Sequence, residues 1–199
     1  MSIKPILFNT DMVRAILDGR KTVTRRKIDV DISNRFDVEI DGKAICYIDQ
    51  ATGDSYKPTE LCRYQPGDIL YVRETWHKYT KRVGKGEGCH LAEFYGYKAS
   101  VKDSEDSNEP WKPSIHMPKE AARIWLKVIN VRVERLQDIT REQAEREGAC
   151  DYTSTADGFA DIWDSTIKKT DADRYGWCAN PWVWVIEFER CDKPQEVSH

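Results

Sequence analysis

The chain of 199 residues lacks the features that would place it in a membrane, secreted or zinc-binding class. No apolar run approaches the ~20 residues that a helix needs to span a bilayer. The N-terminus has no charged-then-apolar signal pattern. The six cysteines never form a Cys-x-x-Cys pair, which argues against a disulfide framework and against ordinary zinc-ligand spacing. We therefore expect a cytoplasmic protein with reduced thiols, no membrane partner, no metal and no cofactor.

The chain also lacks a net basic charge, because its formal charge is -3 and its pI is near 5.9. One stretch departs from this balance, since residues 14–27 contain a single acid, Asp18. The basic residues of this stretch are Arg14, Arg20, Lys21, Arg25, Arg26 and Lys27. A local cluster of basic side chains on an otherwise acidic protein attracts phosphate groups to that part of the surface. A solvated helix end would explain Arg20 and Lys21, but not the run that continues to Lys27.

The same stretch holds Lys21 three residues before Thr24, and these are residue types that can make an activated nucleophile. In a regular strand the two side chains would point to opposite faces, because their spacing is odd. The pair can therefore cooperate only if the backbone turns irregularly after Gly19. An ordinary β-branched strand residue is the other interpretation of Thr24.

Hydrophobic periodicity and turn residues predict strands alternating with a few helices. Asn9 or Thr10 begins one helix, Gly19 follows its end, and Thr140 opens another through a capping box. The apolar phase flips between Val128 and Ile129, which predicts a bulge. The expected strands are 4–8, 69–76, 91–99, 124–136 and 182–188. The expected helices are the one between its cap at Asn9 or Thr10 and Gly19, and those at 140–148 and 157–169. A hairpin is expected at 37–48, with its Asp41-Gly42 turn. The pattern predicts one α+β domain over 1–199 with a barrel-like sheet, an inserted excursion at about 77–118 and a mobile loop after Val101.

Several blocks, in this order, make the chain resemble the ASCH family, in particular its larger branch associated with phages and prophages. The first is Gly-x-Lys-x-x-Thr-x-Arg at 19–26, and the second is Pro-Gly-Asp-Ile-Leu-Tyr-Val-Arg-Glu-Thr-Trp at 66–76. The later blocks are Trp111 to Pro118, Asp138 to Gly148, Trp163-Asp164-Ser165 and Asn180 to Trp184.

The resemblance implies a fold related to the RNA-binding PUA domain, a small β-barrel flanked by helices, with the lysine motif lining a nucleotide or nucleic-acid cleft. One small bacterial branch hydrolyses the amide of N4-acetylcytidine with a lysine, a threonine and a glutamate, which fall here on Lys21, Thr24 and Glu147. Another branch has been associated with RNA cleavage. This chain is much longer than the small hydrolases, and its 77–118 insertion could cover the cleft. Many relatives carry glutamate where this chain has Thr24.

Amide hydrolysis needs a nucleophile, a base and an acid for the departing amine. Thr24 could attack directly or position a water. Lys21 could be the base if crowding and partial burial lower its pKa, with Glu147 passing a proton to the amine. Alternatively, a protonated Lys21 could stabilise the oxyanion and leave Glu147 as the base. We expect Lys21 to be an exposed cleft residue whose removal leaves the fold intact.

The partner predicted from these features is RNA or a modified nucleoside, with DNA as a further option. The expected binding residues are Arg20, Arg25, Arg26, Arg73, Glu74, Trp76, Trp111 and His116. The two tryptophans could stack a base or belong to the core. The alternatives to an enzyme are a non-catalytic RNA- or DNA-binding module and a phage accessory protein that binds a host protein through the 77–118 insertion. The sequence leaves the oligomeric state open.

Overall fold

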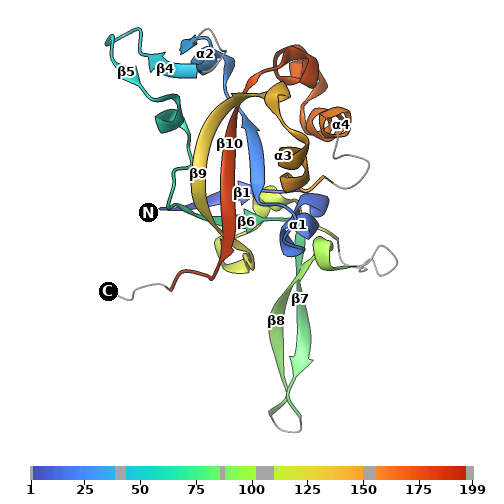
Figure 1. Cartoon of the computed structure of the whole chain (residues 1–199). Helices are drawn as coiled ribbons and strands as arrows, with labels where there is room; N and C mark the ends of the chain where they lie inside the picture. Colours follow the sequence, from blue (N-terminus) through green and yellow to red (C-terminus); the bar gives the residue numbers. More distant parts are fainter. Residues whose placement is uncertain (1, 39–43, 86–87, 102–109, 150–155, 196–199) are drawn as a thin grey trace.

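The computed structural model describes residues 2–38, 44–85, 88–101, 110–149 and 156–195 (Figure 1). Its main sheet has five strands in the order β1-β6-β9-β10-β2. These strands are β1 Ile3–Leu7, β6 Ile69–Arg73, β9 Trp125–Arg135, β10 Trp182–Cys191 and β2 Val23–Lys27. β1 runs parallel to β6, and the other pairs are antiparallel. In this part of the chain β1 and β2 are the edges of the sheet.

Two smaller sheets and a few short helices complete the described elements. One sheet contains β3 Phe36–Val38, β4 Ala44–Ile48 and β5 Ser55–Tyr56, and the other contains β7 Trp76–Val83 and β8 His90–Tyr97. The α-helices are α1 Thr10–Leu17, α2 Val30–Ser33, α3 Arg141–Arg146, α4 Ala156–Thr166 and α5 Ala172–Tyr175. The α+β class is therefore confirmed. The sheet does not close on itself within the described residues, so the barrel stays a prediction.

The local signals at helix ends and at the bulge are confirmed. The Asn9 side chain accepts a hydrogen bond from the Met12 N–H at the start of α1. Thr140 and Gln143 form the reciprocal capping box of α3. The register between β9 and β10 slips past Ile129, since Glu187 pairs with Asn130 and Phe188 pairs with Val128. The predicted Asp41-Gly42 turn and the predicted mobile loop at 102–109 lie outside the described residues.

The expected single strand over 69–76 is wrong, because β6 ends at Arg73 and Trp76 begins a separate strand. β7 pairs with β8 in a long hairpin that projects away from the main sheet (Figure 1). Six of the eight residues of β7 lie outside the core. A strand exposed on both faces has no apolar alternation, so the pattern that reveals half-buried strands is missing here.

The two faces of the main sheet pack against different helices at its β2 edge. On one face, Ile6, Leu70 and Ile186 pack with Val13 and Ile16 of α1. On the other face, the core contains residues of α3, α4, β2 and β10. Its buried members are Val23, Leu136, Ile139, Ala144, Phe159, Trp163, Val183 and Val185. The edge strand β2 is thus flanked by α1 on one side and by α3 and α4 on the other, and the candidate site lies between them.

Candidate functional site

The backbone between α1 and β2 turns sharply and places Lys21 outside the strand. Gly19 has a φ of 76°, a left-handed conformation that favours glycine. The N–H groups of Arg20 and Lys21 both donate to the Ala15 carbonyl, at 2.9 and 3.0 Å. β2 begins only at Val23, so the irregular turn that cooperation between Lys21 and Thr24 requires is present.

Lys21 forms a buried ion pair with Glu147 at the end of α3. Its Nζ lies 2.7 Å from Glu147 Oε2, 2.8 Å from the Glu147 carbonyl and 2.8 Å from the Val23 carbonyl. The two side chains are only 0% and 5% exposed. Three acceptors match the three protons of an ammonium group, so we assign Lys21 as protonated. The expectation of an exposed cleft lysine is therefore wrong.

The electrostatic environment of Lys21 contains two opposing effects. Burial lowers the pKa of Lys21 below 10.5, because water no longer solvates the ammonium, and attraction to the Glu147 carboxylate opposes this shift. The net direction is downward. The proton on Nζ is thus held less tightly than in water, and it lies beside a carboxylate.

A glycine lets the end of α3 approach the turn that carries Lys21. Gly148 has a φ of 91°, and a Cβ there would lie 2.8 Å from Ala15 Cβ and 3.2 Å from Lys21 Cβ. The Thr22 N–H also donates to the Arg146 carbonyl at 2.9 Å. Glu147 can reach Lys21 because the two chain segments touch along their backbones.

Arg25 holds the other oxygen of the same carboxylate. Its Nη1 lies 3.2 Å from Glu147 Oε1, while its Nη2 lies 3.0 Å from Glu134 Oε2 and 2.7 Å from Gln143 Oε1. The Arg25 side chain is fully buried, and its Nε has no hydrogen-bond partner among the described residues. The basic stretch is therefore not a uniform phosphate-binding surface, because Lys21 and Arg25 point inward.

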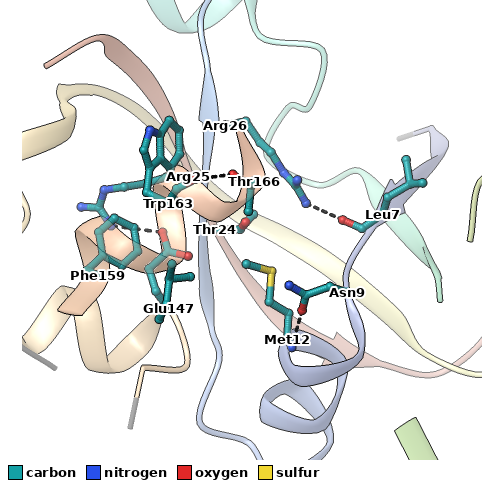
Figure 2. A pocket seen from close by; sticks show the side chains of 11 residues that line it. Leu7, Asn9, Met12, Thr24, Arg25, Arg26, Glu147, Phe159, Trp163 and Thr166 are labelled. Atoms are coloured by element: carbon teal, nitrogen blue, oxygen red, sulfur yellow. Dashed lines mark hydrogen bonds and ion pairs between the residues drawn. The ribbon is translucent and has the colours of Figure 1, made fainter. Parts of the chain in front are cut away.

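A pocket of about 130 Å³ lies next to this cluster (Figure 2). An engineered cavity of about 150 Å³ binds benzene, so the pocket has the size of one six-membered ring. The lining residues come from β1, α1, β2, α4 and the end of α3. They are Leu7, Asn9, Met12, Thr24, Arg25, Arg26, Glu147, Phe159, Ile162, Trp163 and Thr166.

The pocket combines an apolar wall with polar groups that have spare hydrogen-bonding capacity. Figure 2 shows Phe159 and Trp163 on one side, and Thr24, Asn9 and the Glu147 carboxylate around the same space. The Thr24 hydroxyl has no hydrogen-bond partner within the described part of the chain, although Thr24 is only 3% exposed. Because Asn9 Oδ1 accepts from Met12 N–H, the Asn9 amide can donate to a ligand.

Arg26 extends along another side of the pocket. Its Nη2 donates to the Leu7 carbonyl at 2.7 Å, and its guanidinium lies over the Phe8 ring at 5.1 Å. Burial lowers the pKa of Arg26, and Tyr64 and Glu147 oppose the shift. Arg26 thus joins the pocket and carries its positive charge near the strand β1.

The structure brings five of the predicted site residues together: Lys21, Thr24, Arg25, Arg26 and Glu147. It places Arg20 outside this group. Arg20 is partly exposed, pairs with Asp18 at 3.0 Å and donates to the Gly148 carbonyl at 3.1 Å.

The other predicted binding residues lie around the base of the β7–β8 hairpin, away from the pocket lining. Arg73 donates to the Met117 and Ile115 carbonyls, and buried Glu74 pairs with Arg123 at 2.9 Å. The remaining three are Trp76 in the core at 6% exposure, Trp111 against His77 with ring centroids 4.6 Å apart, and exposed His116.

Sequence reasoning did not assign Asn9, Met12 or the α4 residues to the site. Asn9 was visible only as a helix cap, and Phe159 and Trp163 only as the apolar face of a helix. A helix face that packs on a core and also lines a pocket has the same periodicity as one that only packs. The sequence therefore carried no signal that separates the two.

The fold and the site define a class of protein: an α+β protein with a buried lysine–glutamate pair beside a ring-sized pocket at a sheet edge. No known family profile and no curated protein matches the chain. One solved structure is similar, the crystal structure of hypothetical protein PH0355. Its TM-score is 0.42 at 13% identity, and the match covers 96% of this chain and 100% of that chain.

The described residues show neither a metal-binding cluster nor a membrane-spanning helix. No cluster of three or more His, Cys, Asp or Glu side chains that could hold a metal ion occurs among them. None of their helices is long and apolar enough to cross a membrane. The five cysteines that the structure describes are free thiols, at positions 46, 62, 89, 178 and 191.

Proposed function

We propose that this protein is an ASCH-type, PUA-like enzyme whose pocket binds a pyrimidine base and hydrolyses the amide of an N4-acylated cytidine. The observation that carries the proposal is the joint placement of Lys21, Thr24 and Glu147. Glu147 lies 126 residues from Lys21 in the sequence, and its carboxylate both pairs with Lys21 and lines the ring-sized pocket that Thr24 also lines. The same residue types make up the hydrolytic set of the small branch of the ASCH family.

The shape and chemistry of the pocket support a base as the ligand. One pyrimidine ring matches its volume, and the rings of Phe159 and Trp163 offer an apolar wall for the faces of that ring. Asn9 and Thr24 supply hydrogen-bonding groups on the opposite side. The sugar would lie at the mouth, where the pocket opens.

The residues support a simple transfer of protons during hydrolysis. An oxygen nucleophile attacks the acyl carbon, the C–N4 bond breaks, and N4 receives a proton. Thr24 holds a water that supplies this oxygen, or supplies it from its own hydroxyl, in which case a water then hydrolyses the acyl-threonine ester and releases the carboxylic acid. Glu147 accepts the proton of the nucleophile and passes it to N4. Lys21 and Arg25 are positioning residues that fix both oxygens of the carboxylate.

A non-catalytic role as a phosphate-binding module has less support at this site. Lys21 and Arg25 are buried and paired, so they are not available to phosphate. Arg20 and Lys27 are exposed, but each already pairs with an aspartate, at 3.0 and 3.6 Å. A host-protein partner for the 77–118 region stays a prediction.

The test is release of cytidine from N4-acetylcytidine, both as the free nucleoside and within an RNA strand. Glu147→Gln keeps the shape of the side chain but removes its proton-accepting charge. We expect it to lower kcat/KM by roughly 10²–10⁴-fold, the usual contribution of general acid–base catalysis. Glu145→Gln is the matched control, because Glu145 is an exposed residue of the same helix. No release by the wild-type protein from either substrate would refute the proposal.

A further inference from the structure

The pocket faces the main chain of β2 and not only its side chains. Thr24, Arg25 and Arg26 are consecutive strand residues, and all three line the pocket. Successive side chains of a strand point to opposite faces of the sheet. Three successive residues can therefore border one cavity only when the cavity lies against the strand's edge. β2 is an edge strand of the described sheet, which is what this arrangement requires.

The hydrogen bonds that flank β2 show which main-chain groups point toward the pocket. The Phe188 N–H donates to the Thr22 carbonyl, and the Ile28 N–H donates to the Trp182 carbonyl. In an antiparallel pair the residues that exchange hydrogen bonds alternate along each strand. Thr24 therefore belongs to the set that bonds to β10, whereas Arg25 belongs to the set that points away from it.

An independent contact agrees with this assignment. The Val23 carbonyl accepts a hydrogen bond from Lys21 Nζ at 2.8 Å, so it also points away from β10. Arg25 lies two residues further along the strand and has the same orientation. Within the described residues, neither its main-chain N–H nor its carbonyl has a partner outside the sheet ladder. An extended residue thus presents a free donor and a free acceptor side by side.

The Arg25 side chain keeps this edge in place. Its guanidinium is held by Glu147, Glu134 and Gln143, and it lies 5.9 Å from the Phe159 ring centroid. A buried side chain with so many partners leaves the backbone at Arg25 little freedom. The donor–acceptor pair is therefore preorganised for a ligand, which lowers the entropy that binding costs.

We propose that the main-chain N–H and carbonyl of Arg25 bind the edge of the ligand's ring. This inference rests on the proposed function and extends it to base recognition. An N4-acylated cytosine presents an N4–H donor next to the N3 acceptor. Arg25 N–H would donate to N3, and the Arg25 carbonyl would accept from N4–H. Uracil presents its acceptor and donor in the reverse order, so the same edge would select cytosine.

The test is amide hydrogen exchange of the full-length protein measured by NMR. The probes are cytidine, the small cyclic amide 2-pyrrolidone, and N-methyl-2-pyrrolidone, which lacks the donor. At saturation with cytidine or 2-pyrrolidone we expect exchange of the Arg25 amide to slow by about tenfold or more, because a new hydrogen bond protects it. N-methyl-2-pyrrolidone should leave it unchanged. The Lys27 amide is the internal control, because it lies on the same edge but outside the pocket.

The outcomes separate this inference from the proposed function. Arg25 exchange that stays the same with both cytidine and 2-pyrrolidone overturns the inference, even if N4-acetylcytidine is hydrolysed. Protection of Arg25 without any hydrolysis supports edge recognition and refutes the enzymatic activity. Equal protection of Lys27 and Arg25 also overturns the inference, because it would indicate a general stiffening of the strand.

Discussion

Two lysine–glutamate pairs in this protein have the same distance between their charged atoms and opposite environments. Lys21–Glu147 and Lys78–Glu93 both show an Nζ–Oε distance of 2.7 Å. The side chains of the first pair are 0% and 5% exposed, and those of the second are 40% and 65% exposed. Burial lowers the pKa of Lys21, whereas the hydrogen bond to Glu93 raises the pKa of Lys78. Distance alone therefore says little about what an ion pair does.

The surroundings explain why the two pairs differ. In the hairpin, Lys78 and Glu93 lie on a two-stranded ribbon that solvent reaches from both sides. At the pocket, two carbonyls complete the hydrogen bonds of Lys21, and Arg25 holds the second oxygen of Glu147. Water screens the first pair and is replaced by protein groups around the second. The buried pair thus holds the Glu147 carboxylate in one position.

Removing the buried lysine gives the largest expected effect. Lys21→Met should lower the free energy of unfolding by about 3–5 kcal/mol, because it breaks a buried ion pair and leaves two carbonyls without a donor. Lys78→Met is the matched control in the exposed pair and should change stability far less. Chemical denaturation of both variants measures the difference. If both variants lose the same free energy of unfolding, burial does not determine how much a lysine–glutamate pair contributes to stability.

A glycine at the base of the hairpin provides the next test, because it separates packing from charge. A Cβ on Gly96 would lie 1.8 Å from His77 Nε2. His77 is buried and packs against the rings of Trp111 and Tyr79, so its ring cannot simply move aside. Gly96→Ala should cost about 1–3 kcal/mol through overpacking.

Gly88→Ala is the control for this substitution. A Cβ there meets nothing within 4 Å, and Gly88 lies at the other end of the same hairpin. Thermal unfolding should distinguish the two variants. If Gly96→Ala is as stable as the wild type, the hairpin is not held at its base by the contact between His77 and Gly96.

The same contrast explains which parts of the structure the sequence could predict. The capping box at Thr140 and the bulge at Ile129 depend on neighbouring residues, and both were predicted. The exposed strand β7 has no burial pattern, and it was missed. The burial of Lys21 depends on Glu147, 126 residues away, so no local pattern could reveal it. The family resemblance supplied Glu147, and only the fold supplied the aromatic wall of the pocket.

The pH dependence of hydrolysis should distinguish the two roles considered for Lys21. If protonated Lys21 positions Glu147, the rate should fall as the pH rises through the lowered pKa of Lys21, because the ammonium that holds the carboxylate is lost. Initial rates of cytidine release, measured between neutral and alkaline pH, would show this fall in the rate. A rate that rises through the same range would instead assign Lys21 as the general base.

Thr24→Val is expected to have the smallest effect on stability. The Thr24 side chain lines the pocket and its hydroxyl has no described hydrogen-bond partner, so replacing it with a methyl group breaks no described hydrogen bond. The free energy of unfolding should therefore stay the same or rise slightly, as measured by chemical denaturation. A large loss of stability would reveal a hydrogen bond that the described structure does not contain.

The same variant tests the central claim, that the pocket at the β2 edge is a hydrolytic site, most directly. The measurement is kcat/KM for release of cytidine from N4-acetylcytidine by the wild type and by Thr24→Val. Both proteins are assayed under conditions in which they are fully folded. Because the hydroxyl supplies or holds the attacking oxygen, activity should fall by roughly 10²-fold or more while the fold is retained. Wild-type activity in a correctly folded Thr24→Val protein would contradict the account.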